Sequence, residues 1–198
     1  MTTLRHVTHT TAPRRDRRGV ARRLGAAVVA VAALATLAPA AHAGPVAPDV
    51  PGKIQVEAGH KLFLVTHAVG VQIYSCNATA DGYAWGLVAP RADLYGDNGK
   101  LIATHFGGPS WQARDGSTVV GSVVDRAPAA GTIPWLLLSA DSSAGEDGDR
   151  LAGTTFIQRI STTGGVAPAA SACNLSTVGS REEIPYTADY LFWTRTGA

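Results

Sequence analysis

The stretch Tyr-Thr-Ala-Asp-Tyr-Leu-Phe-Trp-Thr-Arg, residues 186–195, indicates the fold class most directly. Side chains of an extended chain alternate between two faces. Here one face carries Tyr186, Ala188, Tyr190 and Phe192, and the other carries Thr187, Asp189, Leu191 and Trp193. This period of two, sustained along the whole stretch, predicts a β-strand.

The chain before this strand breaks into short β-prone runs separated by turn residues. The clearest turn is Gly96-Asp97-Asn98-Gly99, because Asn-Gly accommodates the positive φ values of a tight hairpin. Asp115-Gly116 predicts a second tight turn. The runs span residues 61–66, 71–76, 83–88, 92–95, 100–105, 118–124, 133–139 and 154–160. No window shows a sustained helical period with caps, so we expect no long helix.

These runs predict an all-β, single-domain protein, either a β-sandwich or a barrel-like fold of about nine short, mainly antiparallel strands. We favour two packed sheets. The length of 198 residues suits one domain. A content of 45% hydrophobic and 16% charged residues excludes a disordered chain, a collagen, a coiled coil and a multi-span membrane protein.

Residues 1–43 differ in composition from the rest. Seven arginines precede an apolar run over residues 24–38, and Ala41-His42-Ala43 follows as a small-x-small cleavage site. This order predicts a secretory signal peptide cleaved between Ala43 and Gly44. An uncleaved membrane anchor and a basic arm for nucleic acid are the alternatives. Arg22-Arg23-Leu24 leaves open whether export follows the general or the twin-arginine route.

Cleavage would leave a Pro/Gly-rich extended segment over residues 44–53 and one β domain over residues 54–198. Residues 44–198 hold ten basic and fourteen acidic side chains, a formal charge of −4, so we expect no nucleic-acid partner. We expect a secreted, extracellular protein, free or associated with the cell envelope, with no stable membrane span after cleavage.

Cys76 and Cys173 both follow the predicted leader. In an oxidising compartment two cysteines in one small domain usually pair, which predicts one long-range disulfide. Free thiols and metal thiolates are the alternatives. Asn77-Ala-Thr79 and Asn174-Leu-Ser176 are N-glycosylation sequons, which matter only in a glycosylating host.

An ordered set of motifs resembles a known family over roughly residues 54–195. The motifs are Gly-Val-Gln-Ile-Tyr-Ser-Cys at 70–76, His-Phe-Gly-Gly-Pro-Ser-Trp at 105–111, Asp-Gly-Ser at 115–117, Ile-Pro-Trp-Leu-Leu-Leu at 133–138, Thr-Gly-Gly-Val-Ala-Pro at 163–168 and Pro-Tyr-Thr-Ala-Asp-Tyr at 185–190. The family comprises secreted bacterial and fungal proteins catalogued only as a domain of unknown function. Some members carry a malate dehydrogenase label, which we do not transfer because the chain has no G-x-G-x-x-G opening a helix. The resemblance implies no catalytic residue.

The segment 105–111 is the most unusual in the chain. His105 and Trp111 could be presented together by a rigid Gly-Gly-Pro loop, and Asp115 could complete an acid/base pair or a ligand platform. The alternative is a structural turn in which Trp111 is buried and Asp115 caps its own loop.

Aromatic side chains could also stack on a sugar. Trp135 and Trp193 lie in apolar or alternating runs and are expected in the core, whereas Trp85 and Trp111 are candidate binding residues together with His105.

The spacing of the histidines and of the acidic residues does not favour a metal site. A strand over residues 61–66 would place His60 and His67 on opposite faces, so we do not expect them to join His105 around a metal. The acidic stretch 141–149 lacks the spacing of an EF-hand, which favours a solvated loop over a weak calcium site. We expect no metal and no cofactor.

The sequence therefore favours an extracellular or envelope binding module whose partner is a cell-wall polysaccharide or a small extracellular ligand. A small, metal-assisted extracellular enzyme centred on His105 and Asp115 is one alternative. A purely structural envelope protein is the other. No catalytic motif is recognisable, so catalysis stays an open question.

Overall fold

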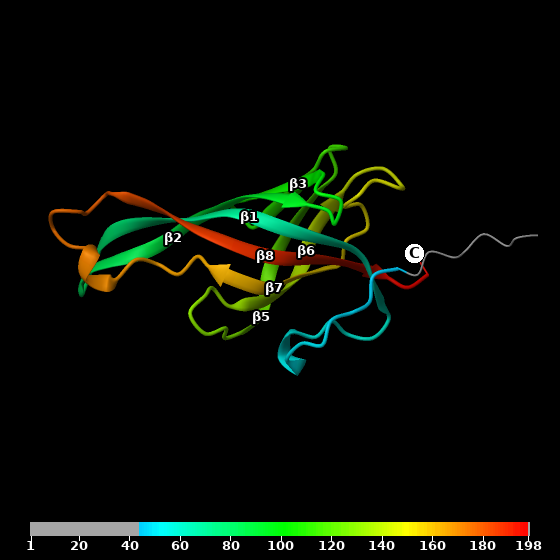
Figure 1. The fold of residues 1–198 in the computed structure, drawn as a ribbon, viewed down its shortest axis with the longest axis horizontal. Helices are drawn as coiled ribbons and strands as arrows, with labels where there is room; N and C mark the ends of the chain where they lie inside the picture. Colours follow the sequence, from blue (N-terminus) through cyan, green and yellow to red (C-terminus); the bar gives the residue numbers. More distant parts are fainter. Residues whose placement is uncertain (1–43, 198) are drawn as a thin grey trace, which may run out of the picture. The chain divides into compact units, whose positions relative to one another are not determined.

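The computed structural model describes residues 44–197. The predicted signal peptide lies outside the described residues, as does Ala43 at its cleavage site. Two short 3-10 helices and eight strands follow one another, and we find no helix among residues 44–197 that is long and apolar enough to cross a membrane. In chain order the elements are η1 (Gly52–Ile54), β1 (His60–Thr79), β2 (Gly82–Tyr95), β3 (Leu101–Phe106), β4 (Ser110–Ala113), β5 (Thr118–Ala127), β6 (Trp135–Ala144), β7 (Phe156–Gly164), η2 (Ala170–Ala172) and β8 (Arg181–Arg195) (Figure 1).

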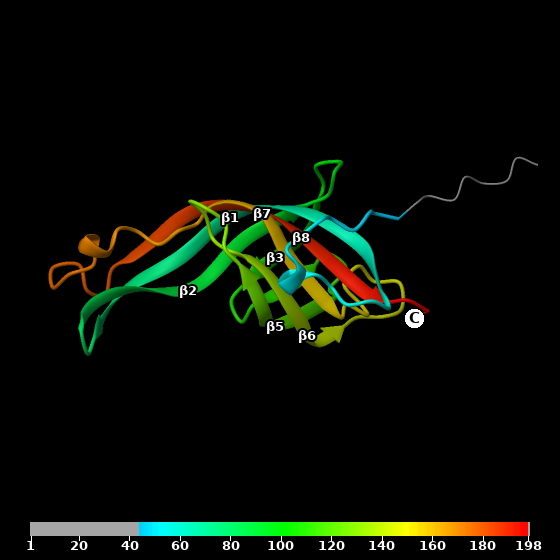
Figure 2. The same cartoon turned by 90° about the horizontal axis from the view of Figure 1, so that it is seen from below.

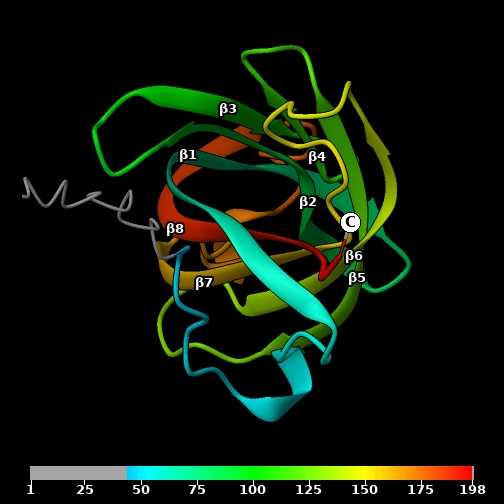
Figure 3. The same ribbon diagram turned by 90° about the vertical axis from the view of Figure 1, so that its right-hand side faces the viewer.

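The eight strands form one closed antiparallel barrel. Each strand pairs with the next along the chain, and β8 returns to pair with β1 over residues 181–195. Figure 3 shows the strands surrounding a common axis. The all-β prediction is confirmed, and of its two architectures the barrel-like one is observed, with a single sheet in place of two packed ones.

Two strands are longer than the sequence predicted. The runs 61–66 and 71–76 merge into β1 because Gly70 does not break the strand. A Cβ at Gly70 would lie 2.4 Å from the Cβ of Ala92, so the glycine lets β1 and β2 approach closely. The runs 83–88 and 92–95 likewise merge through Pro90. β3 pairs only with residues 92–95 of β2, so Pro90 lies in a stretch of β2 that has one neighbouring strand, β1, and such an edge stretch tolerates proline.

The far halves of β1 and β2, together with the start of β8, extend beyond the barrel as a three-stranded arm (Figures 1 and 2). The loop between β7 and β8 follows this arm and is tied to it by the predicted disulfide, now confirmed, between Cys76 and Cys173. Backbone hydrogen bonds reinforce the tether: Gly179 N–H donates to the carbonyl of Cys76, and Cys76 N–H donates to that of Ser180.

Both faces of the barrel wall are buried in places. The even-numbered residues of β8 that the sequence grouped together, including Tyr190 and Phe192, fill the barrel interior. Trp193, on the other face, packs beneath Ile54 of the N-terminal segment. Gln158 links the two, since its Nε2 donates to the carbonyl of Ile54 and its Oε1 accepts from Trp193 Nε1.

The acidic stretch 141–149 is only partly a loop. Its first four residues continue β6, where Asp141 accepts a hydrogen bond from the hydroxyl of Ser122 at 2.6 Å. Only the part beyond Ala144 turns back towards β7.

Candidate functional site

A cavity of about 410 Å³ opens at the end of the barrel from which the arm extends. Its rim and walls are mainly apolar and come from β2, from β5, from β6 and from the segment just before β6. They include Leu87, Val88, Val123, Ile133, Leu136 and Leu138. Its floor carries the polar and aromatic side chains Gln72, Tyr74, His105, Trp111, Arg159 and Tyr190.

Strand register brings the floor together. His105 near the end of β3 faces Trp111 near the start of β4, because the turn at residues 107–109 reverses the chain between them. Gly108 takes φ of 102° in this turn, a conformation that favours glycine. On the opposite wall, Arg159 of β7 pairs in register with Tyr190 of β8, so both side chains point inward from neighbouring strands.

His105 and Trp111 form a buried stack. Their rings lie parallel with centroids 4.4 Å apart, and the ring of Tyr190 meets both edge-on. His105 Nδ1–H donates to the carbonyl of Ser110 at 2.9 Å, which leaves Nε2 as the acceptor nitrogen. Burial lowers the pKa of His105 to about 3, so the imidazole is neutral at physiological pH.

Two buried polar atoms of the floor lack hydrogen-bond partners in the described part of the chain. They are the indole Nε1 of Trp111 and the amide Oε1 of Gln72, and both side chains are almost fully buried. Buried polar atoms are nearly always paired, because an unpaired one loses its hydrogen bonds to water without replacement. Both side chains line the cavity, so its floor carries one donor and one acceptor that the described residues leave unused.

The two tyrosines of the floor, Tyr74 and Tyr190, find hydrogen-bond partners within the protein, Tyr190 through Tyr186 behind it. Tyr74 donates from its hydroxyl to the carbonyl of Gly165 at 2.7 Å, and the hydroxyls of Tyr186 and Tyr190 lie 3.3 Å apart. Burial raises the pKa of all three phenols, so they remain protonated. Tyr74 and Tyr190 therefore line the cavity as neutral phenols.

Asp115 does not join this site. It lies in the turn between β4 and β5 and does not line the cavity. Its carboxylate accepts hydrogen bonds from the hydroxyl and N–H of Ser117 and from the N–H of Arg150, and the bond from the Ser117 hydroxyl is the main cause of its lowered pKa. The structure therefore brings Trp111 to His105 but does not place Asp115 beside the imidazole, as an acid/base pair would require.

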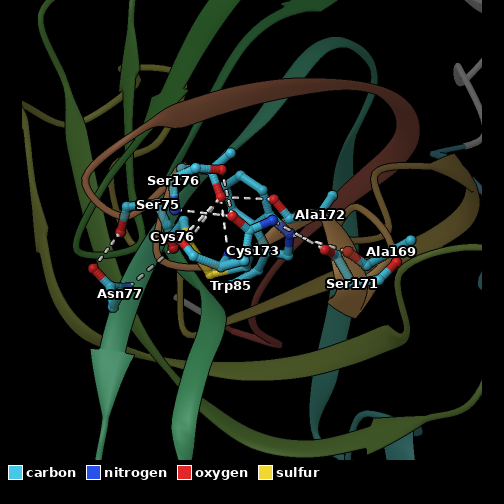
Figure 4. The surroundings of a disulfide bond; sticks show 11 residues. Ser75, Cys76, Asn77, Trp85, Ala169, Ser171, Ala172, Cys173 and Ser176 are labelled. Carbon is cyan, nitrogen blue, oxygen red and sulfur yellow. Dashed lines mark hydrogen bonds between the residues drawn. A yellow bond between two sulfur atoms is a disulfide. The ribbon is translucent and has the colours of Figure 1, made fainter.

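Trp85 also lies outside the cavity. It sits on the arm opposite Cys76, and its indole N–H donates to the carbonyl of Ala169 at 3.3 Å beside the disulfide (Figure 4). The two candidate tryptophans thus belong to different parts of the molecule and do not form one aromatic surface.

The remaining histidines are held separately. His67 bridges two carboxylates on the outer surface, with Nε2 at 2.8 Å from Asp97 and Nδ1 at 2.7 Å from Asp189. These bonds raise its pKa, the one to Asp97 most strongly. His60 packs edge-on against Phe156. Within residues 44–197 no group of three His, Cys, Asp or Glu side chains is arranged to hold a metal ion.

Sequence reasoning did not single out Arg159, Gln72 or Tyr190. A signal for Arg159 does exist, since it is the one charged residue in the β-prone run 154–160. Gln72 likewise alternates with Val71 and Ile73 in an apolar strand. A polar residue in such a run faces either solvent or a buried site. Which of the two holds becomes visible only in the structure of the closed barrel.

Comparison with known proteins identifies a family but no activity. Residues 57–100 and 96–194 match the family model described as "Protein of unknown function (DUF3455)". Neither the curated proteins nor the solved structures contain a significant match. The match confirms the predicted relationship to a family catalogued only as a domain of unknown function.

Proposed function

The chain belongs to the DUF3455 family of proteins of unknown function, and from the geometry of its cavity we propose that it binds a small, largely apolar organic molecule. The observation that carries the proposal is the pair of unpartnered buried atoms, Trp111 Nε1 and Gln72 Oε1, in the polar floor of a cavity whose walls are mainly apolar. A ligand with a polar end would satisfy them while its body contacts the walls.

The dimensions of the cavity support this class of ligand. Sites for small molecules typically enclose about 300–1,000 Å³ and combine apolar walls with a few converging polar groups. The volume of about 410 Å³ falls in this range. Leu87 and Val88 at the rim are 58% and 45% exposed, so the cavity is reached from solvent past apolar side chains.

A small ligand fits the site better than a polysaccharide. A sugar-binding surface needs an aromatic face open to solvent, but Trp111 is only 1% exposed and stacks on His105. We favour binding over catalysis because His105 is neutral and its predicted partner Asp115 does not line the cavity. We further propose that binding takes place outside the cytoplasm, which the Cys76–Cys173 disulfide supports.

The experiment is a titration of the purified protein with N-phenyl-1-naphthylamine, a neutral dye that fluoresces in apolar surroundings. We expect saturable binding with one site per chain. Leu136→Trp places a larger side chain in the cavity wall and should weaken binding at least tenfold. Leu175→Trp, at a position 75% exposed and away from the cavity, is the matched control and should bind as the unmodified protein does.

Binding that does not saturate would overturn the proposal. So would an affinity left unchanged by Leu136→Trp in a variant that retains its circular dichroism spectrum. A rise in melting temperature with dye gives an independent readout on the unmodified protein, because a ligand bound only by the native state stabilises it by mass action.

A further inference from the structure

Arg159 is a buried cation without an anionic partner. Its side chain rises from β7 into the floor of the cavity and is only 9% exposed. Its Nε and Nη2 donate to the carbonyl of Pro134 at 3.2 and 2.8 Å, and the hydroxyl of Tyr190 is a second neutral group beside it. A guanidinium has five N–H donors, so these two neutral neighbours leave part of its hydrogen-bonding capacity unused and its charge uncompensated.

The arginine and lysine ion pairs of the described chain lie on the surface, in contrast to the buried and unpaired Arg159. Arg91 meets the carboxylate of Glu183, and Lys53 meets that of Asp125, both on the exposed surface where pairing matters least. Arg159 makes no salt bridge within residues 44–197, although burial makes an unpaired charge most unfavourable there. A buried arginine without a carboxylate partner suggests that a bound ligand supplies the negative charge.

The cavity itself is positively charged in a chain that is otherwise acidic. Its lining includes the guanidinium groups of Arg159 and Arg126 and no aspartate or glutamate. Residues 44–198 together carry more acidic than basic side chains. The positive charge of Arg159 also acts on His105 in the same floor and helps to lower the pKa of its imidazole.

Donors and apolar surface converge in a way that matches one ligand class. The Trp111 indole N–H is unpaired, the Arg159 guanidinium has free N–H groups, and the walls above them are apolar. Arginine recognises carboxylates and similar planar anions through paired, charge-assisted hydrogen bonds. A neutral ligand would leave the buried charge unpaired.

We infer that the cavity binds a small organic anion, whose carboxylate or equivalent group pairs with Arg159 and whose apolar body lies against the walls. This inference rests on the proposed function, because it names the ligand class of the same site. It assigns Arg159 as the residue that selects anionic over neutral ligands of the same shape.

The test compares 2-naphthoate with 2-naphthamide as competitors of bound N-phenyl-1-naphthylamine. The two compounds share shape and apolar area and differ in charge. We expect the unmodified protein to bind the naphthoate at least tenfold more tightly. Arg159→Gln retains a donor for the carbonyl of Pro134 but removes the charge, so it should reduce the preference to about onefold. Arg159→Lys should retain part of it.

Arg91→Gln is the matched control, since Arg91 is exposed, paired with Glu183 and absent from the cavity lining. It should leave the preference for naphthoate unchanged. If Arg159→Gln does not fold, the ratio in the unmodified protein and its retention in Arg159→Lys decide the matter.

The outcomes separate the two claims. Equal affinity of the unmodified protein for naphthoate and naphthamide, with the dye still bound, would overturn the anionic ligand and leave the cavity as a binding site. A preference that persists in folded Arg159→Gln would overturn the role of Arg159. Failure of the dye and both competitors to bind would overturn the proposed function itself.

Discussion

Removing the disulfide should destabilise the protein mainly through its unfolded state. Cys76 and Cys173 are 97 residues apart, and in the chain-entropy model a cross-link closing a loop of this length contributes about 4.7 kcal/mol. The double variant Cys76→Ala/Cys173→Ala also deletes two buried sulfur atoms, which adds roughly 1 kcal/mol of lost packing. Since small domains are stable by only about 5–15 kcal/mol, the variant should be marginally folded.

The native state itself should change little. The N–H of residue 76 still donates to the carbonyl of Ser180, and the N–H of Gly179 still donates to the carbonyl of residue 76, so the loop stays held to the arm. Trp85 still donates to the carbonyl of Ala169. Neither cysteine lines the cavity, so dye affinity should be preserved wherever the variant is folded.

Urea denaturation followed by circular dichroism measures the effect. We expect the free energy of unfolding to fall by about 4–6 kcal/mol and the m-value to rise, because the unfolded chain without its cross-link exposes more surface. Ser176→Ala, an exposed change in the same loop, should alter stability by less than about 0.5 kcal/mol. A loss below about 1 kcal/mol with an unchanged m-value would refute the argument from loop closure.

Three further predictions concern single side chains. Gln72→Leu should raise the free energy of unfolding of the ligand-free protein by about 1 kcal/mol or more, because it removes an unpaired buried carbonyl oxygen; destabilisation in a urea titration would contradict this. His67, whose pKa is raised by its carboxylate partners, should contribute stability that is present below pH 6.5 and lost as the pH rises through its folded pKa. Comparing unfolding midpoints of the protein and of His67→Gln from about pH 5 to about pH 9 checks this, and parallel profiles would exclude it. His105, with its pKa lowered to about 3, should remain neutral in the native protein, so stability should fall as the pH drops below 6.5 and the unfolded imidazole takes up a proton. Titration of its ring resonances by NMR near pH 6.5 would contradict the buried neutral ring.

Local features of the fold were predictable because local residues determine them. The hairpin at residues 96–99 joins β2 to β3, with Gly99 N–H donating to the carbonyl of Gly96 and a positive φ of 71° at Gly99 alone, and the turn at Asp115-Gly116 leads into β5. The alternation over residues 186–195 also holds, with Tyr190 and Phe192 inside the barrel. A period of two fixes which side chains share a face.

The closure of the barrel was not predictable by the same means. It depends on pairing between β1 and β8, at opposite ends of the described chain, in a register that no local signal reports. The period of two also does not say which face is interior when both are covered. Here the N-terminal segment buries the outer face around Trp193, so both faces look apolar in the sequence.

The same ambiguity explains why the polar floor of the cavity was missed. The sequence places Gln72 and Tyr74 on one face of a strand. It does not show whether that face is exposed to solvent or enclosed by the barrel. Arg159 follows Gln158 in β7, and both are buried, on opposite sides of the wall. Only the closed barrel shows that Gln158 bonds to the N-terminal segment and that Arg159 faces the cavity.

The most direct test of a ligand site in the barrel uses the indole N–H resonances of the protein in ¹⁵N-labelled form. Saturation with N-phenyl-1-naphthylamine should shift the resonance of Trp111, whose N–H is unpaired in the cavity floor. The resonances of Trp85 and Trp193, whose N–H groups are bonded to Ala169 and Gln158, should stay in place. A Trp111 resonance that does not move at saturation would contradict the account.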